Sequence, residues 1–204
     1  QADRCRDILR SMGRAGNDDL HLRQAPFSAL VNEAAEPHMH RGKAVLYDEA
    51  PLEGGDFQQP TVLRKPEIIH GLRNLVQNAV DFSRSTVWIT AAWDDTTIVL
   101  RISDDGKGFP PQLLGRIGDP FVRRRKGESE HHQRPEYEGM GLGLFIAKTL
   151  LERTGAQLRF ANGREADHAT DRRGAVVVVT WPRKKIDAME DGGPVIGKNL
   201  PLEI

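Results

Sequence analysis

The sequence has 204 residues, enough for one well-developed hydrophobic core with short appendages. Lys+Arg and Asp+Glu both number 29, so the formal net charge is zero and gives no global electrostatic reason to expect nucleic-acid binding. A single cysteine, Cys5, excludes an internal disulfide framework and a cysteine-rich metal site, and is typical of a reducing compartment.

The first twelve residues predict an amphipathic helix with one narrow apolar seam. Ala2, Cys5, Leu9 and Met12 recur at spacings of three and four, a pattern that needs a partner helix. The N-terminus is charged, and no run of about 18 apolar residues occurs, so we expect neither a secretory signal nor a membrane span in this sequence. The sequence begins within the helical pattern and without methionine, which indicates part of a longer protein.

Residues 17–183 predict one α+β unit. The helix from Pro66 is strongly amphipathic with proline in its first turn, and a hairpin follows it, hinged at Asp94-Asp95. Before them, short apolar runs alternate with Gly/Pro-rich turns around one short helix. The expected elements are a helix over 27–35, strands between 36 and 64, the helix from 66, strands over 85–92 and 97–103, a short helix after Pro110-Pro111, a helix over 142–153, and strands over 157–161 and 174–181.

Two polar stretches lie outside these elements. Residues 122–138 show no periodicity, and a loop of that length inside a compact domain is unusual unless it works as a lid. The tail over 184–204 is rich in glycine and proline and is expected to be peripheral or disordered.

Glycines open the helix that follows the polar loop. Gly139, Gly141 and Gly143 could take positive φ and approach a polyphosphate closely, while the helix N-terminus supplies N–H groups and a positive dipole end. The alternative is a tight turn that packs the helix against a strand.

A second glycine cluster follows Asp104 at the end of an apolar strand. The carboxylate could accept a hydrogen bond from an exocyclic amine such as that of adenine, and Gly106 and Gly108 would let a flat base approach the backbone. An ordinary Asp-Asp-Gly turn is the alternative.

Asn74 and Asn78 lie four residues apart on the helix from Pro66, so both carboxamides project from one face. An amide oxygen is a suitable hard ligand for Mg²⁺ bound to phosphate. A merely solvated polar face is the alternative.

These segments together resemble the GHKL ATPases, and in order and spacing the catalytic ATP-binding domain of sensor histidine kinases. Residues 74–79 resemble the N box, 104–108 the first glycine box, 119–121 the F box and 139–144 the second glycine box. The resemblance implies a two-layer α/β sandwich of the Bergerat type, with a mixed, mainly antiparallel sheet and helices on one face.

The sequence is also similar to RegB/PrrB-type redox-sensing kinases, through residues 3–9, 137–155, 174–176 and Trp181-Pro182. This similarity implies that residues 1–16 are the end of the dimerisation hairpin plus a linker, that 17–183 are the catalytic domain, and that the phosphoacceptor histidine lies upstream. It also implies a homodimer, transfer to a response regulator receiver domain, and the cytoplasmic portion of a bacterial kinase anchored in the inner membrane.

The resemblance assigns roles to individual residues. Asn78 would coordinate Mg²⁺, Asn74 would assist at the phosphates or the metal, and Asp104 would bind the adenine amine. Phe82 would lie against adenine, and Arg123 would reach the γ-phosphate. The remaining nucleotide-binding positions implied by the motifs are Gly106, Gly108, Phe121, Gly139, Gly141, Leu142, Gly143 and Leu144.

One position departs from the family pattern. Where the N box often carries a lysine near phosphate, this sequence has Asp81, which would repel a triphosphate if it pointed inward. We therefore expect Asp81 to face solvent or to pair with a base, and Arg73, Arg84 or the lid to supply positive charge.

The role of Cys5 has two interpretations. Spacing alone favours a small apolar residue in the seam, although Arg4 and Arg6 would favour the thiolate. The resemblance favours redox control through an intermolecular disulfide.

Other functions remain as alternatives. GHKL ATPases of the gyrase, Hsp90 or mismatch-repair kind use a helix glutamate where this sequence has His70, and a nucleotide-independent interaction module is a further possibility. His131 and His132 fit no metal-ligand spacing, and the basic run 123–126 lacks the interleaved aromatic residues of a nucleic-acid site, so we expect neither a histidine metal site nor nucleic-acid binding.

Overall fold

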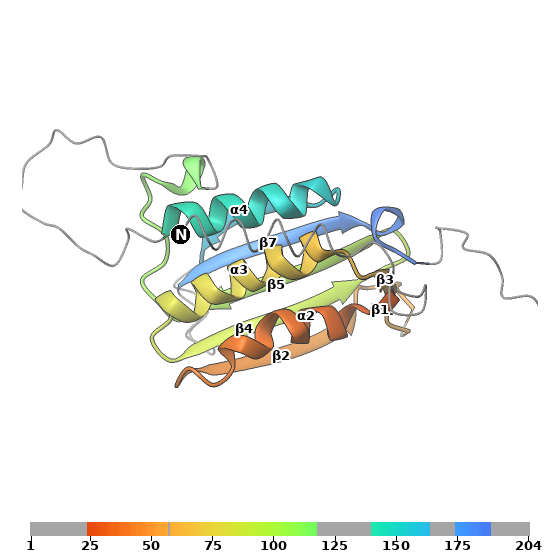
Figure 1. The fold of residues 1–204 in the computed structure, drawn as a ribbon, viewed down its shortest axis with the longest axis horizontal. Helices are drawn as coiled ribbons and strands as arrows, with labels where there is room; N and C mark the ends of the chain where they lie inside the picture. Colours follow the sequence, from red (N-terminus) through yellow and green to blue (C-terminus); the bar gives the residue numbers. More distant parts are fainter. Residues whose placement is uncertain (1–23, 57, 118–139, 164–173, 189–204) are drawn as a thin grey trace, which may run out of the picture.

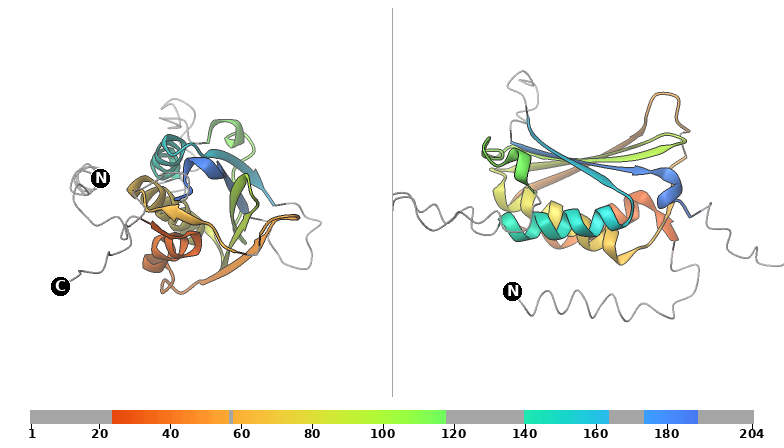
Figure 2. Two further views of the ribbon diagram at one scale, coloured as in Figure 1. Left: turned by 90° about the vertical axis from the view of Figure 1, so that its right-hand side faces the viewer. Right: turned by 90° about the horizontal axis from the view of Figure 1, so that it is seen from above.

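The computed structural model describes residues 24–56, 58–117, 140–163 and 174–188. They form two layers: helices lie across one face of a five-stranded sheet (Figure 1), and Figure 2 shows the layers edge on. The strand order is β2-β4-β5-β7-β6, with β2 and β4 parallel and all other neighbours antiparallel. The predicted α+β sandwich, with a mixed and mainly antiparallel sheet, is confirmed. The strands are β2 (Ala44–Pro51), β4 (Thr86–Trp93), β5 (Thr97–Asp104), β6 (Gln157–Asn162) and β7 (Ala175–Pro182).

The helix α3 (Pro66–Phe82) is the central element of the helical layer. Pro66 occupies its first turn, where a missing N–H removes no intrahelical bond. Ile68, Leu72 and Leu75 point into the core and are at most 1% exposed. On either side lie α2 (Phe27–Ala35) and α4 (Met140–Arg153) (Figure 1).

Close packing of α3 against α4 depends on a glycine. A Cβ added at Gly71 would lie 2.5 Å from the Leu151 Cγ. Real Cβ atoms do not approach that closely, so the absence of a side chain at Gly71 lets Leu151 fill the space between the two helices.

The strands β4 and β5 form the predicted hairpin. Burial alternates along β4 and along most of β5, because one face of the sheet packs on the helices and the other does not. At the turn, Asp94 Oδ1 accepts hydrogen bonds from the N–H groups of Thr96 and Thr97, both at 2.7 Å. The expected hinge at Asp94-Asp95 is therefore confirmed, and the Asp94 side chain stabilises it through these two hydrogen bonds.

The expected start of the tail at 184 is corrected. The short helix η5 (Arg183–Lys185) turns the chain back, and Ile186 is fully buried. Leu63 N–H donates to the Ile186 carbonyl at 2.7 Å, and Ala188 N–H donates to the Thr61 carbonyl at 2.9 Å. The Gly/Pro-rich composition beyond 190 concealed this short apolar anchor. Residues 1–16 and 189–204 lie outside the described residues.

A few smaller elements complete the described fold. A two-stranded sheet of β1 (Gln24–Pro26) and β3 (Thr61–Leu63) is antiparallel. Two further 3-10 turns are η2 (Glu36–His38) and η3 (Leu114–Arg116), the latter at the place of the short helix expected after Pro110-Pro111. Among the helices of the described ranges, none has the length and apolar character needed to cross a bilayer.

Candidate functional site

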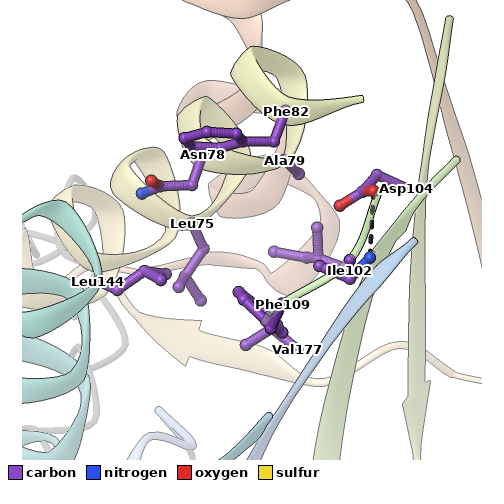
Figure 3. A pocket seen from close by; sticks show the side chains of 11 residues that line it. Leu75, Asn78, Ala79, Phe82, Ile102, Asp104, Phe109, Leu144 and Val177 are labelled. Atoms are coloured by element: carbon purple, nitrogen blue, oxygen red, sulfur yellow. Dashed lines mark hydrogen bonds between the residues drawn. The ribbon is translucent and has the colours of Figure 1, made fainter. Parts of the chain in front are cut away.

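A cavity lies where the end of α3, the end of β5 and the start of α4 meet (Figure 3). Its walls are largely apolar, with one carboxylate and one carboxamide, a composition that suits a flat organic ring with a few polar atoms. Its volume is about 30 Å³. The lining residues are Leu75, Asn78, Ala79, Phe82, Ile102, Asp104, Gly108, Phe109, Leu144, Ala175 and Val177.

Asp104 is the carboxylate of this cavity and is only 2% exposed. Its Oδ1 accepts hydrogen bonds from Gly106 N–H at 2.8 Å and from Ala175 N–H at 3.1 Å, the second of which is drawn in Figure 3. Burial raises the pKa of Asp104 to about 6, although the two N–H groups and Lys43 lower it. The side chain is therefore a fixed, poorly solvated acceptor at the edge of an apolar space.

The two asparagines of α3 have the same orientation. Asn78 Nδ2 donates to the Asn74 carbonyl at 2.7 Å, and Asn74 Nδ2 donates to the His70 carbonyl at 2.8 Å. Each amide nitrogen is thereby held by the helix backbone. Within the part of the chain that the structure describes, each Oδ1 is left to accept a donor or to coordinate a cation. Asn78 lines the cavity, whereas Asn74 lies one turn earlier and is not among the lining residues.

The glycines after β5 are explained by contacts within the protein. A Cβ at Gly106 would lie 2.2 Å from the Phe82 carbonyl oxygen, and one at Gly108 would lie 2.7 Å from Asn162 Oδ1. Gly108 also has φ = +72°, which a residue with a side chain rarely adopts. Both glycines therefore let this loop pass close to α3 and β6. Gly108 also lines the cavity, and the role of the two glycines in shaping a base pocket stays a prediction.

Gly141 and Gly143 lie within α4 rather than in a loop before it. The helix begins at Met140, two residues before the expected start at Leu142, so Gly141 and Gly143 lie within its first turn. Gly143 has helical backbone rather than positive φ, and a Cβ there would lie 3.0 Å from Asn78 Nδ2. Backbone N–H groups of a first helical turn have no intrahelical partner, which suits a phosphate. Leu144 lines the cavity, whereas Leu142 is 46% exposed and does not.

Two residues of this region had received no role from the sequence. Asn162, at the end of β6, accepts from Phe109 N–H at 2.7 Å through Oδ1 and donates to the Phe109 carbonyl at 2.8 Å through Nδ2. Phe109 is 5% exposed and packs edge-on against Phe160, with ring centroids 6.0 Å apart. In the sequence, an asparagine followed by glycine at a strand end indicates only an ordinary turn. The two hydrogen bonds from the Asn162 side chain to the Phe109 backbone are therefore visible only in the folded structure.

Gly174 is a third residue without an assigned role, and its lack of a side chain makes room for Asp104. A Cβ there would lie 2.0 Å from Asp104 Oδ1 and 2.5 Å from its carbonyl oxygen. Gly174 N–H also donates to that carbonyl at 3.0 Å. The start of β7 can therefore lie against the carboxylate only because residue 174 has no side chain.

Asp81, in place of the usual lysine, is exposed and pairs with Arg41, with Nη1 and Oδ1 2.7 Å apart. Both expected outcomes for this residue thus occur together. His70 is half-buried, and its pKa is lowered mainly by that burial and then by the charge of Arg73. The predicted positions Cys5, Phe121, Arg123 and Gly139 lie outside the described residues.

The arrangement can be compared with known proteins. The sequence family described as "Histidine kinase-, DNA gyrase B-, and HSP90-like ATPase" matches residues 64–185. The mycobacterial sensor histidine kinase MprB has a similar fold, with a TM-score of 0.56 and 21% identity over 78% of this chain and 97% of that one. The catalytic domain of the histidine kinase ThkA gives the same TM-score at 20% identity, over 78% of this chain and 93% of its own.

Curated relatives extend the similarity beyond the family region. Sensor histidine kinase RegB of Cereibacter sphaeroides is 58% identical over 99% of this chain and 43% of its own length. Signal transduction histidine-protein kinase AfsQ2 of Streptomyces coelicolor is 34% identical over 60% of this chain and 21% of its own length. The chain thus spans less than half the length of the relatives it matches. It belongs to the histidine kinase-, DNA gyrase B- and HSP90-like ATPase family, as an ATP-binding domain of the RegB type.

Proposed function

We propose that this chain is the catalytic ATP-binding part of a RegB-like sensor histidine kinase. It would bind ATP with Mg²⁺, and in the full-length protein the γ-phosphoryl group would pass to a histidine upstream and then to a response regulator. The observation that carries the proposal is the convergence of Asn78, Asp104 and Leu144, from three separate sequence motifs, on one cavity. Membership of an ATPase family implies that ATP is used.

The base would enter the apolar cavity with its amine toward Asp104. An ionised, buried carboxylate is a strong acceptor for such an N–H donor, and Phe82 offers an aromatic wall for a flat ring. Analogues that lack the exocyclic amine should therefore bind more weakly, because the carboxylate would stay buried without its ligand donor.

The phosphates would lie between Asn78 and the first turn of α4. Asn78 Oδ1 suits Mg²⁺ because its amide nitrogen is committed to the Asn74 carbonyl, and Asn74 would assist at the metal or the phosphates. When bound, Mg²⁺ would neutralise charge on the phosphoryl oxygens. The N–H groups around Gly141 and Gly143 would bind phosphate oxygens, and Arg123, which lies outside the described residues, would meet the γ-phosphate.

Transfer itself would need a second element. The bond between the γ-phosphorus and the bridging oxygen breaks, ADP leaves, and a histidine nitrogen on the dimerisation helix forms the new bond. We expect this chain to bind nucleotide without phosphorylating itself. In the full-length protein we infer a homodimer in the cytoplasmic portion of a membrane-anchored bacterial kinase.

Calorimetry with ADP and with a non-hydrolysable ATP analogue, each with and without Mg²⁺, tests the assignment. Asn78→Ala should lose the benefit of Mg²⁺, while Asp104→Ala should weaken binding about tenfold or more under both conditions. The exposed Asp95 at the β4–β5 turn provides a matched control, Asp95→Ala, that should bind as the wild type does. Absence of binding by the wild type, or wild-type affinity in both site variants, would show the assignment to be wrong.

The ATPase alternative is tested by the reaction product. His70 stands one turn before Asn74, where the hydrolytic relatives carry a glutamate, so we expect slow release of inorganic phosphate at most. Supplying the upstream helix in trans with labelled ATP should instead yield phosphohistidine. Rapid hydrolysis with no phosphohistidine would favour an ATPase.

Cys5 is proposed as a redox switch. Two Cys5 thiols from neighbouring chains would lose two protons and two electrons to an oxidant, and the disulfide formed would lower kinase output. Non-reducing electrophoresis of oxidised wild type should show a covalent dimer that Cys5→Ala cannot form. Because Cys5 is the single cysteine, a covalent dimer in that variant would exclude this mechanism.

A further inference from the structure

The turn that joins α3 to β4, residues 80–86, is held by a lysine that lies just before the strand β2. Lys43, immediately before β2, donates from Nζ to the Val80 carbonyl at 2.5 Å and to the Ser83 carbonyl at 2.7 Å, with the Asp81 carbonyl at 3.4 Å. The last carbonyls of a helix have no intrahelical partner and form the negative end of its dipole. A half-buried lysine at that end therefore satisfies and stabilises them.

The other side of the same turn is held by a carboxylate. Asp105 is 8% exposed and accepts hydrogen bonds from Arg84 N–H at 2.7 Å, from Ser85 N–H at 3.1 Å and from Thr86 N–H at 3.2 Å. The Ser85 hydroxyl donates to it as well, at 2.6 Å. The turn thus has a cation on its carbonyls and an anion on its amides.

The sheet topology brings the two charges together. Ala44 N–H donates to the Ser85 carbonyl at 2.8 Å, and Ala44 faces Thr86 in the parallel β2–β4 pair, so Lys43 must lie beside this turn. Asp105 follows the end of β5, which neighbours β4 on its other side. Lys43 and Asp105 therefore meet at this turn only because β2, β4 and β5 pair in this order.

The turn at residues 80–86 borders the cavity. Phe82 lines it, and the Phe82 carbonyl lies where a Cβ at Gly106 would be. Asp104, the residue before Asp105, is the cavity's carboxylate. A shift of the turn would therefore move the aromatic wall and the end of β5, which carries the acceptor.

We propose that Lys43 and Asp105 form a clamp that positions the adenine end of the nucleotide site. This inference rests on the proposed nucleotide binding and adds two positioning residues to which the motifs assign no role: Lys43, which lies outside the motifs, and Asp105, which lies within the first glycine box. Without the clamp, the turn samples arrangements that cannot bind the base, and the apparent affinity falls by the fraction of competent molecules.

The charges of the clamp supply a second readout. Of the described charged groups, Asp105 raises the pKa of Asp104 and Lys43 lowers it, while Phe82 and Ala175, which border Asp104 from α3 and β7, are apolar. Since the ionised carboxylate accepts from the adenine amine, affinity should fall as pH drops through that pKa. Loss of Lys43 should move this midpoint to higher pH, and loss of the Asp105 charge should move it to lower pH.

The test is calorimetry with Mg·ADP on the full chain between pH 5 and 8.5, together with thermal unfolding of each variant. Lys43→Met should weaken binding about tenfold, whereas Lys43→Arg should keep most of the affinity because a guanidinium can also donate to the carbonyls. Asp105→Asn should also weaken binding. Lys184→Met, which removes an exposed lysine of η5, is the matched control and should bind as the wild type does. Lys43→Gln replaces Lys43→Met if the latter does not fold.

The outcomes separate the clamp from the proposed function. Weakened binding with opposite displacements of the pH midpoint supports the clamp. Two results would overturn the clamp while nucleotide binding by the wild type stands. One is wild-type affinity in both Lys43→Met and Asp105→Asn. The other is a loss of affinity in which the two pH midpoints move in the same direction or do not move. Absence of binding by the wild type overturns the proposed function and the clamp with it.

Discussion

Asp104→Asn should make the free protein more stable at neutral pH while impairing nucleotide binding. The asparagine Oδ1 can still accept from the N–H groups of Gly106 and Ala175, so the local hydrogen bonds remain possible. What disappears is the cost of keeping an ionised carboxylate in a site that is 2% exposed. A buried charge held for a ligand is a common source of conflict between stability and function.

The sign and size of this effect on the free energy of unfolding follow from the raised pKa of Asp104. In the folded chain the pKa of Asp104 rises from 3.8 to about 6, mainly through burial. Such a group costs no stability well below pH 3.8, and its cost grows as pH rises and is complete well above about 6. The pKa difference between the folded and the unfolded chain corresponds to a loss of about 3 kcal/mol in the free energy of unfolding. About 2.5 kcal/mol of this loss develops between pH 4 and pH 8.

Urea unfolding of wild type and Asp104→Asn at pH 4 and pH 8, without nucleotide, measures this effect. The free energy of unfolding of the variant minus that of the wild type should increase by about 2 to 3 kcal/mol across this range. Other titrating groups are common to both proteins and cancel in the difference. A difference that stays constant, or one that decreases with pH, would refute the burial argument for Asp104.

Two further predictions concern residues that the motifs do not contain. Gly174→Ala should lower the free energy of unfolding by about 1 to 3 kcal/mol in urea and weaken ADP binding, because its Cβ would collide with Asp104. The control Gly115→Ala should be near neutral, because no atom of the described residues lies within 4 Å of an added Cβ there. Asn162→Ala removes both hydrogen bonds to the Phe109 backbone and should cost about 1 to 3 kcal/mol of stability, with weaker ADP binding measured by calorimetry; unchanged values for both quantities would contradict the bridging role.

The sequence predicted the elements whose patterns are long and regular. The amphipathic spacing along α3 and the β-branched runs of β4 and β5 depend on burial of one face, which periodicity reveals directly. The start of α4 was misplaced by two residues because Gly141 and Gly143 resemble a loop, although tertiary packing beside Asn78 accommodates them in a helix. The anchor at Ile186 was missed because one buried residue in a Gly/Pro-rich context has no period.

For the site, the sequence by itself determined the chemistry: an amide pair on one helix face, a carboxylate at the end of a strand, and glycines at the start of a helix. These features are local, and their spacing alone restricts what they can bind. Only the tertiary structure decided what surrounds them. The register of β2 beside β4 places Lys43 at the end of α3. The pairing of β7 and β6 places Gly174 against Asp104 and Asn162 against Phe109. Such contacts join residues far apart in the chain, and no local pattern specifies them, because they exist only once the sheet has paired its strands.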